Sequence, residues 1–272
     1  MRPIGYLSPV LMVSFLALSV IGPAASEVAA VTPTPNSAVF NLRVFNDCPT
    51  SVLTTGNSYP ASLFIEDNDL SCGGFANLHN WRFSEDASTE AVFNNDANYY
   101  FCATLVISGT SEGEAGLSVA PWWSQDVDGR FNVRTTDGEV ACFGGRLPFY
   151  SFTGSDGVTY TKGNSITLEV TYLANGLSEA DPATIEYELT YLASSYSSGP
   201  LPFDEGNPAE GYGAWGELDD ARVGGYIQPF LQGGNPDAGL RADWTDVCYE
   251  NRDSAIPVES TSWGRLKDLY GN

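Results

Sequence analysis

Two carboxylates in the segment Trp215-Gly-Glu-Leu-Asp-Asp-Ala-Arg222 have the spacing that acid–base chemistry on a sugar requires. In an extended strand, Glu217 and Asp219 point to the same face, with about 7 Å between them. Two carboxyl groups at that separation can protonate a glycosidic oxygen and assist attack at the anomeric carbon. Glu217 and Asp219 are therefore candidate catalytic residues.

The same segment resembles part of the Glu-x-Asp-x-x-Glu strand of the concanavalin-like glucanases, which are a jelly-roll family. Glu217 and Asp219 match the first two positions of that motif, the nucleophile and its supporting acid. The third position, the acid/base, falls at Ala221 or Arg222, and neither residue can donate a proton in that role. The resemblance implies a jelly-roll glycoside hydrolase that takes its acid from elsewhere in the chain.

A pair of aspartates indicates a second kind of site. Asp126 and Asp128 are followed by Gly129, so their side chains offer hard oxygen ligands on a tight turn. Calcium prefers such ligands, and it is the one cofactor that the sequence suggests. The further acid and the closing glutamate of a full calcium loop are missing. A simple Asp-Gly turn is the alternative interpretation.

Tryptophans near these acids indicate carbohydrate binding. Trp122 and Trp123 point to opposite sides of an extended chain, so one packs inward while the other is exposed. An exposed indole can stack on the apolar face of a sugar ring. With Trp215, these residues are the predicted ligand-binding side chains, and core packing is the expected role of at least one of Trp122 and Trp123.

Cysteine and histidine usage limits metal and redox chemistry. The chain has five cysteines without a CxxC motif, and a single histidine, His79, so a zinc site lacks ligands. We interpret His79 as a half-buried strand residue. Thiols of exported proteins tend to pair. The expected bridges are Cys48–Cys72 and Cys102–Cys142, with Cys248 left free and buried.

Composition excludes several partners. The formal net charge of −22 disfavours nucleic acid, whose binding needs a basic surface, and it disfavours anionic membranes. Cation binding or simple solubility fits this charge better. A chain of 272 residues with 43% hydrophobic residues can form one domain with a large core.

The N-terminus has the features of a secretory signal peptide. Arg2 precedes an apolar run over residues 10–21, which is followed by small residues. The run is shorter than the roughly 20 residues that a transmembrane helix needs. We therefore expect residues 1–30 to be removed and the mature protein to be secreted, with no transmembrane segment. The absence of Asn-x-Ser/Thr sequons favours a bacterial source.

Strand patterns dominate the rest of the chain. Alternating apolar and polar residues predict strands at 40–44, 99–107, 131–133, 140–142, 166–172 and 185–191, and weaker strands at 214–218, 221–230 and 242–250. Turn residues such as those of Thr135-Thr-Asp-Gly138 separate them. Strands with one solvated face are typical of antiparallel sheets. The sequence predicts an all-β protein, a two-sheet antiparallel β-sandwich of jelly-roll, concanavalin-like type.

The chain therefore divides into four parts. A Pro/Thr linker over 31–37 follows the signal peptide, the β-sandwich domain covers 38–256, and a C-terminal tail covers 257–272. In this tail, Ser262 can cap a short amphipathic helix that aligns Trp263, Leu266 and Tyr270. The tail is interpreted as a helix packed on the sandwich, or alternatively as a docking or export tag.

Three functions follow from these features. The first is a secreted non-catalytic β-sandwich that binds a polysaccharide or another cell-surface component. The second is a structural or surface-attached exoprotein docked through its C-terminal tail. The third is the jelly-roll glycoside hydrolase that would use Glu217 and Asp219.

Overall fold

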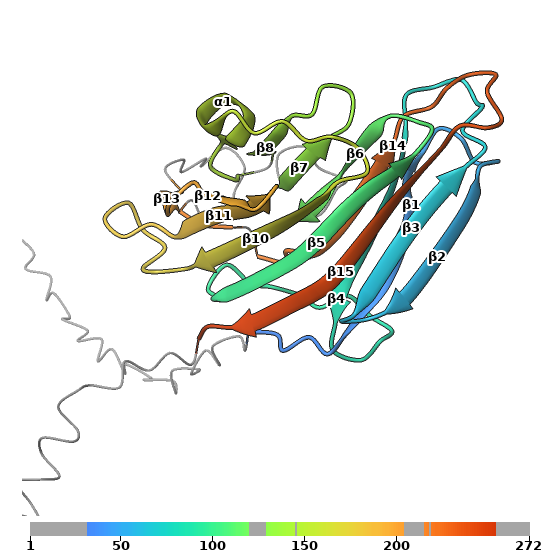
Figure 1. The fold of residues 1–272 in the computed structure, drawn as a ribbon. Coiled ribbons are helices and arrows are strands. Elements are labelled where there is room, and N and C mark those ends of the chain that lie inside the picture. The colour runs from blue at the N-terminus through green and yellow to red at the C-terminus, as the bar shows by residue number, and fades with distance from the viewer. Residues whose placement is uncertain (1–31, 120–128, 145, 204–214, 218, 254–272) are drawn as a thin grey trace, which may run out of the picture.

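The computed structural model describes residues 32–119, 129–144, 146–203, 215–217 and 219–253. These residues form two antiparallel sheets that face each other, together with one short helix, α1 (Phe152–Asp156) (Figure 1). The seven-stranded sheet has the spatial order β1 (Ser37–Asn46), β4 (Asn77–Ser84), β14 (Gly224–Pro229), β6 (Gly113–Ser118), β7 (Arg130–Arg134), β8 (Val140–Phe143) and β9 (Tyr150–Ser151).

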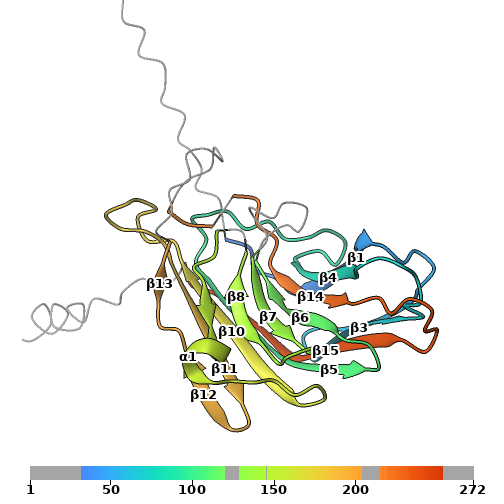
Figure 2. The same ribbon diagram turned by 90° about the horizontal axis from the view of Figure 1, so that it is seen from above.

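The eight-stranded sheet covers one face of the first. Its order is β12 (Ser194–Ser197), β11 (Thr184–Tyr191), β10 (Ser165–Leu173), β5 (Tyr99–Gly109), β15 (Gly239–Asn251), β3 (Ser62–Asn68) and β2 (Val52–Ser58), with β13 (Leu201–Pro202) beside β11. Figure 2 shows the two layers from above.

The chain crosses repeatedly between the sheets. Strands β3, β5 and β15 belong to one sheet, and β4, β6 and β14, each next to one of these in the chain, belong to the other. The late strands insert between early ones, because β14 lies between β4 and β6 while β15 lies between β3 and β5. The expected all-β, two-sheet antiparallel sandwich of jelly-roll type is confirmed.

Strands with one solvated face match the sequence prediction best. In β10 and β11, buried residues alternate with half-buried ones along nearly the whole strand. The prediction of a strand at 214–218 was wrong, because residues 215–217 form a turn and bend that leads towards β14. The sequence also gave no indication of α1, which begins after Ser151 and ends at Gly157 in a left-handed conformation.

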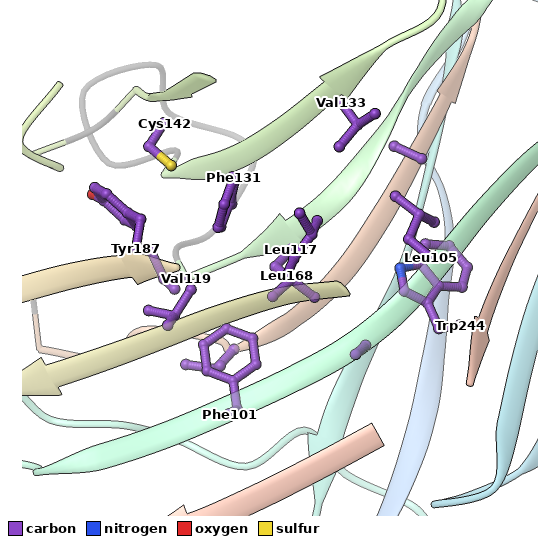
Figure 3. Close-up of a cluster of buried hydrophobic side chains, with 14 of the residues drawn as sticks. Phe101, Leu105, Leu117, Val119, Phe131, Val133, Cys142, Leu168, Tyr187 and Trp244 are labelled. Carbon is purple, nitrogen blue, oxygen red and sulfur yellow. The ribbon is translucent and has the colours of Figure 1, made fainter. Parts of the chain in front are cut away.

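The core lies between the sheets (Figure 3). Phe101, Leu105 and Trp244 enter it from the eight-stranded sheet, and Leu117 and Phe131 enter it from the seven-stranded one. All five side chains are almost completely buried. This interior is what fixes the outer side chains of both sheets in place.

The start of the described chain is tied to its end. The Tyr249 hydroxyl donates to the carbonyl of Pro33 at 2.8 Å, and Asn251 Nδ2 donates to the carbonyl of Thr32 at 3.2 Å. The predicted signal peptide and the C-terminal tail lie outside the described residues. Within the described ranges, no helix has the length and apolar character needed to cross a bilayer.

One predicted disulfide is confirmed and the other is wrong. Cys48 is bonded to Cys72 as expected. Cys102 is bonded to Cys248, not to Cys142, because Cys102 and Cys248 lie opposite each other on neighbouring strands β5 and β15. Cys142 lies on β8 of the other sheet, where its thiol is buried and free. Two disulfides are typical of a protein outside the cytosol.

This pairing predicts which thiol reacts. When the oxidised protein is unfolded without reductant and alkylated, one equivalent of label should be incorporated, and it should map to Cys142. Burial raises the pKa of this thiol, so the folded protein should label far more slowly. Label recovered at Cys248, as the sequence alone would suggest, would contradict the pairing.

Candidate functional site

The central strands of the seven-stranded sheet are buried on both faces. All residues of β4 and β14 are buried, as are Arg130–Val133 of β7. One alternating set of side chains, including Trp81, Leu117 and Phe131, belongs to the core between the sheets. Successive side chains point to opposite faces, so the intervening residues lie on the outer face. We use the name polar face for eight polar residues of this outer set: Asn80, Arg82, Glu114, Ser118, Arg130, Asn132, Tyr226 and Gln228.

Strand register arranges the polar face in rows that cross the sheet. One row consists of Val39, Arg82, Gly224, Ser118, Arg130 and Phe143. The next consists of Asn41, Asn80, Tyr226, Gly116, Asn132 and Ala141. Arg82 and Arg130 thus share a row, three strand spacings or about 14 Å apart at their backbones. Between them lie only the small residues Gly224 and Ser118.

Gly116 allows two side chains of the second row, Tyr226 and Asn132, to contact each other. Tyr226 and Asn132 are on either side of Gly116, and the Tyr226 hydroxyl donates to Asn132 Oδ1 at 2.5 Å. A Cβ at position 116 would lie 1.9 Å from the carbonyl oxygen of Phe131. Glycine at this position is therefore required by the close approach of β7, and it leaves room for the Tyr226 side chain.

Hydrogen bonds hold both arginines. Arg130 Nη1 donates to Gln228 Oε1 at 3.1 Å and to Glu114 Oε2 at 3.3 Å, and its guanidinium lies 4.7 Å from the centre of the Tyr226 ring. Burial raises the pKa of Glu114, although Arg130 acts to lower it. A raised pKa favours the neutral carboxyl and so weakens its hold on the Arg130 charge.

Arg82 has a neutral partner on its own strand. Turned so that its oxygen faces Arg82, which is the orientation that satisfies both of its neighbours, the Asn80 amide accepts from Arg82 Nη2 at 3.0 Å and donates to the carbonyl of His79 at 3.2 Å. Asn132 differs, because its Nδ2 is buried and has no hydrogen-bond partner in the described part of the chain. The polar face therefore combines two guanidinium groups with an amide donor whose protons are unused.

Burial is deepest at the centre of the polar face and lower at the ends of its rows. Arg82, Arg130 and Asn132 are 2%, 4% and 0% exposed. Val39 at one end of the arginine row and Phe143 at the other are half-buried, as is Glu114. Low access to water strengthens electrostatic interactions at the centre of the face. A ligand would meet donors fixed in position by packing, in the manner of a pre-formed site.

The candidate catalytic carboxylates do not share one face. Glu217 is buried, and both of its carboxylate oxygens lie within hydrogen-bonding distance of the Tyr99 hydroxyl, at 2.6 and 2.7 Å. Asp219 is exposed, and its Oδ1 accepts from the backbone N–H of Asn95 at 3.1 Å. The expected geometry assumed an extended strand, whereas this segment turns.

Of the other residues predicted to bind a ligand or a metal, the structure describes only Trp215. Trp215 is half-buried, and its carbonyl accepts from the N–H of Ala183 at 2.8 Å. Trp122, Trp123, Asp126 and Asp128 lie outside the described residues, so their roles in ligand and calcium binding stay predictions. Among the residues that the structure does describe, no group of three or more His, Cys, Asp or Glu side chains could hold a metal.

His79 is a buried structural residue. Its exposure is 0%, and its Nε2 lies 3.0 Å from Asp67 Oδ2, which comes from the facing sheet. Its Nδ1 accepts the backbone N–H of Arg43 at 2.9 Å. Because Nδ1 must be unprotonated to accept, Nε2 carries the proton and donates to the carboxylate. His79 is a strand residue as predicted, but it lies deeper than the half-buried position expected.

The sequence did carry a signal for the polar face. Arg130 and Asn132 alternate with Phe131 and Val133, so the period-two pattern that locates the strand also places both on its other face. Such a pattern is ordinarily interpreted as a solvated face. What it cannot reveal is that several strands align these residues into shared rows and that they are buried.

Comparison with known proteins shows no family for this chain. No protein-family model and no curated protein matches the sequence. Solved jelly-roll structures do resemble its fold. One is a family 7 alginate lyase, A1-II′, in complex with product, with a TM-score of 0.42, 8% identity, and coverage of 70% of this chain and 80% of that one.

Two further structures have similar scores. Alginate lyase AlgAT5 of polysaccharide lyase family 7 has a TM-score of 0.41 and 8% identity, over 79% of this chain and 94% of that one. A functionally unknown protein from Saccharomyces cerevisiae has a TM-score of 0.40 and 11% identity, over 79% and 96% of the two chains. At these identities the likeness concerns the arrangement of strands alone.

Proposed function

We propose that this protein is a secreted, non-catalytic β-sandwich that binds a carboxylate-bearing polysaccharide on its polar face. The observation that carries the proposal is the placement of Arg82, Arg130 and the Nδ2 donor of Asn132, which has no described partner, in neighbouring rows of one buried outer face. Guanidinium groups and amide N–H groups donate to carboxylate oxygens, and a guanidinium does so in a fork of matched geometry.

The net charge of the chain favours recognition of an acidic polysaccharide through short-range contacts. With a net charge of −22, the chain repels a polyanion at long range. Repulsion between exposed charges is largely screened beyond about 10 Å at ordinary ionic strength, whereas contacts made at a buried site are screened much less. The two arginines therefore determine whether an acidic chain binds. Glu114, whose pKa is raised by burial, competes less for Arg130 as the pH falls.

Polar side chains around the arginines suit sugar hydroxyls. Gln228 and Tyr226 offer groups that both donate and accept, and Ser118 lies between the arginines in their row. Hydroxyl-rich ligands need such mixed partners, because each unpaired buried polar group costs free energy. The exposed-tryptophan contribution from Trp122 or Trp123 remains part of this proposal, as does calcium binding at Asp126 and Asp128.

A panel of polymers tests the proposal. We expect the protein to bind a polyuronate, and to bind the same polymer much more weakly after its carboxyl groups are reduced to alcohols. Arg130→Gln and Arg82→Gln should each weaken binding by roughly ten- to a hundred-fold, because a hydrogen bond to a charged group is worth about 1.5–3 kcal/mol. Affinity electrophoresis and calorimetric titration measure both effects.

A matched control lies on the other sheet. Arg241 on β15 is bonded to Asp243 and Glu66, so Arg241→Gln removes one positive charge far from the polar face. This variant should bind like the natural protein. Equal binding to the carboxyl-reduced polymer, or equal loss in the Arg241 variant, would contradict the proposed site. Release of new sugar ends in the same tubes would contradict the non-catalytic assignment.

A further inference from the structure

A buried acid anchors the segment that leads into β14. We call residues 215–217 and 219–221 the anchor segment. Its Glu217 is 4% exposed and points among aromatic side chains, where the Tyr99 hydroxyl is 2.6 Å from Oε1 and 2.7 Å from Oε2. Tyr99 itself is fully buried at the start of β5. The carboxyl group is thus inserted into the end of the sandwich.

A chain of hydrogen bonds continues from Glu217. Its backbone N–H donates to the Tyr172 hydroxyl at 3.1 Å, and that hydroxyl donates to the carbonyl of Asn95 at 2.7 Å. The backbone N–H of Asn95 in turn donates to Asp219 Oδ1 at 3.1 Å. The side chains and backbone of the anchor segment are therefore bonded alternately to β10 and to the loop before β5.

Backbone pairs hold both ends of the same segment. The carbonyl of Trp215 accepts from Ala183 N–H at 2.8 Å, just before β11. At the other end, Ala221 and Phe93 exchange two backbone hydrogen bonds, of 2.9 and 3.0 Å. Gly224, the first residue of β14, follows three positions later and lies opposite Arg82.

No described cation faces the buried carboxyl. The titratable groups from the surrounding elements are phenols and acids: Tyr99 of β5, Tyr172 of β10, Tyr187 of β11, Asp96 of the preceding loop and Asp219 of the anchor segment. Burial raises the pKa of Glu217 to about 8, and the hydrogen bond from Tyr99 opposes that rise. An ionised Glu217 would be a buried charge without a counter-ion, which is unfavourable.

We propose that Glu217 is a proton-dependent anchor: its protonated carboxyl holds the anchor segment on the end of the sandwich, and loss of the proton releases it. The inference rests on the docking contacts and on the absence of a described counter-ion. It does not depend on glycan binding. Because the segment leads into β14, its release also loosens the strand that carries Tyr226 and Gln228.

The direction of the pH effect follows from linkage. A released carboxyl has an ordinary pKa of about 4.3, whereas the docked one has a pKa of about 8. Docking is therefore strongest below the released value and weakens as the pH rises towards the docked value. Between the two values, the equilibrium constant for release rises about tenfold per pH unit, and above the docked value it levels off.

Hydrogen exchange on the full chain measures this release. At pH 5.5, 6.5 and 7.5, after correction for intrinsic exchange rates, protection of amides in the anchor segment should fall about tenfold per pH unit. Glu217→Gln keeps the shape of the side chain and cannot ionise, so its protection should not vary with pH. Asp219→Asn is the matched control, because it removes an exposed acid from the same segment and should retain the slope. Amides of β10 serve as an internal reference.

Two results would overturn the proposal. One is protection of the anchor segment that stays constant over this pH range in the natural protein. The other is a Glu217→Gln variant that keeps the natural slope. If that variant does not fold, Tyr99→Phe decides: losing the hydrogen bond that lowers the Glu217 pKa should extend the slope above pH 8. A slope that still ends near pH 8 in Tyr99→Phe would also contradict the proposal.

Discussion

Replacing Trp244 by alanine is expected to lower the free energy of unfolding by about 3–5 kcal/mol. Trp244 is fully buried between the sheets (Figure 3), and its ring contacts Trp81 edge to face with 6.1 Å between ring centres. Its indole N–H donates to the carbonyl of Gly116 at 3.3 Å, so one side chain of β15 bonds directly to β6 of the facing sheet. Alanine would leave a cavity and remove that bond.

Urea unfolding provides the measurement, and Phe149→Ala provides the control. Phe149 is a large aromatic residue with 70% of its surface exposed, so its removal should change stability by less than 1 kcal/mol or so. If both variants lost the same free energy, Trp244 would not be the inter-sheet contact described here. Because Gly116 separates Tyr226 from Asn132, Trp244→Ala should also disturb the polar face and weaken polysaccharide binding.

The fold could be predicted where strands bury a single face. Ile166, Leu168 and Val170 alternate with polar residues, and β10 forms as the pattern indicates. In strand β4, Asn80 and Arg82 alternate with Trp81 and Phe83, and both faces are buried. The strand patterns did not include this segment, although His79 was expected to lie on a strand. Polar residues at buried positions are the signature of the polar face, and only strand register brings them together.

Local spacing failed where the chain departs from an extended strand. Glu217 and Asp219 would share a face in a strand, but the turn places one in the interior and the other at the surface. Disulfide pairing failed for a different reason. Cys102 meets Cys248 across strands that are 146 residues apart in the chain, and no local pattern encodes that register. The first error concerns a local turn, and the second concerns strand register over a long sequence separation.

Two buried acids in this fold respond to pH in opposite directions. Burial raises the pKa of Glu217, so its contribution to stability falls as the pH rises from about 4.3 towards about 8. For Asp67, burial alone would raise the pKa, but hydrogen bonds from His79, Asn77 and Ser51 outweigh it and lower the pKa. Its contribution is present above the ordinary aspartate pKa and is lost as the pH falls. Together, these two acids favour a stability maximum at mildly acidic pH.

Asp67→Ala is the second large effect that we expect, a loss of roughly 2–5 kcal/mol at neutral pH. Asp67 is fully buried, and its Oδ2 accepts from Asn77 Nδ2 at 2.7 Å and from His79 Nε2 at 3.0 Å. Alanine would leave the His79 Nε2–H without its acceptor and would remove the shortest bond of Asn77, whose Nδ2 keeps Ser51 Oγ at 3.1 Å. Each unsatisfied buried donor costs about 1–3 kcal/mol.

The pH dependence distinguishes this network from simple packing. Denaturant unfolding at pH 7 and at pH 3 should show the difference between natural protein and Asp67→Ala narrowing at the lower pH. Below the ordinary aspartate pKa of about 3.9, the unfolded chain takes up a proton before the folded carboxylate does, because the pKa of Asp67 is lowered in the folded protein. Glu66→Ala, on the same strand, removes a partly exposed acid paired with Arg241 and should cost about 1 kcal/mol or less. A pH-independent loss in Asp67→Ala would mean that the residue acts through its volume, and the ionised carboxylate would then have no part in joining the two sheets.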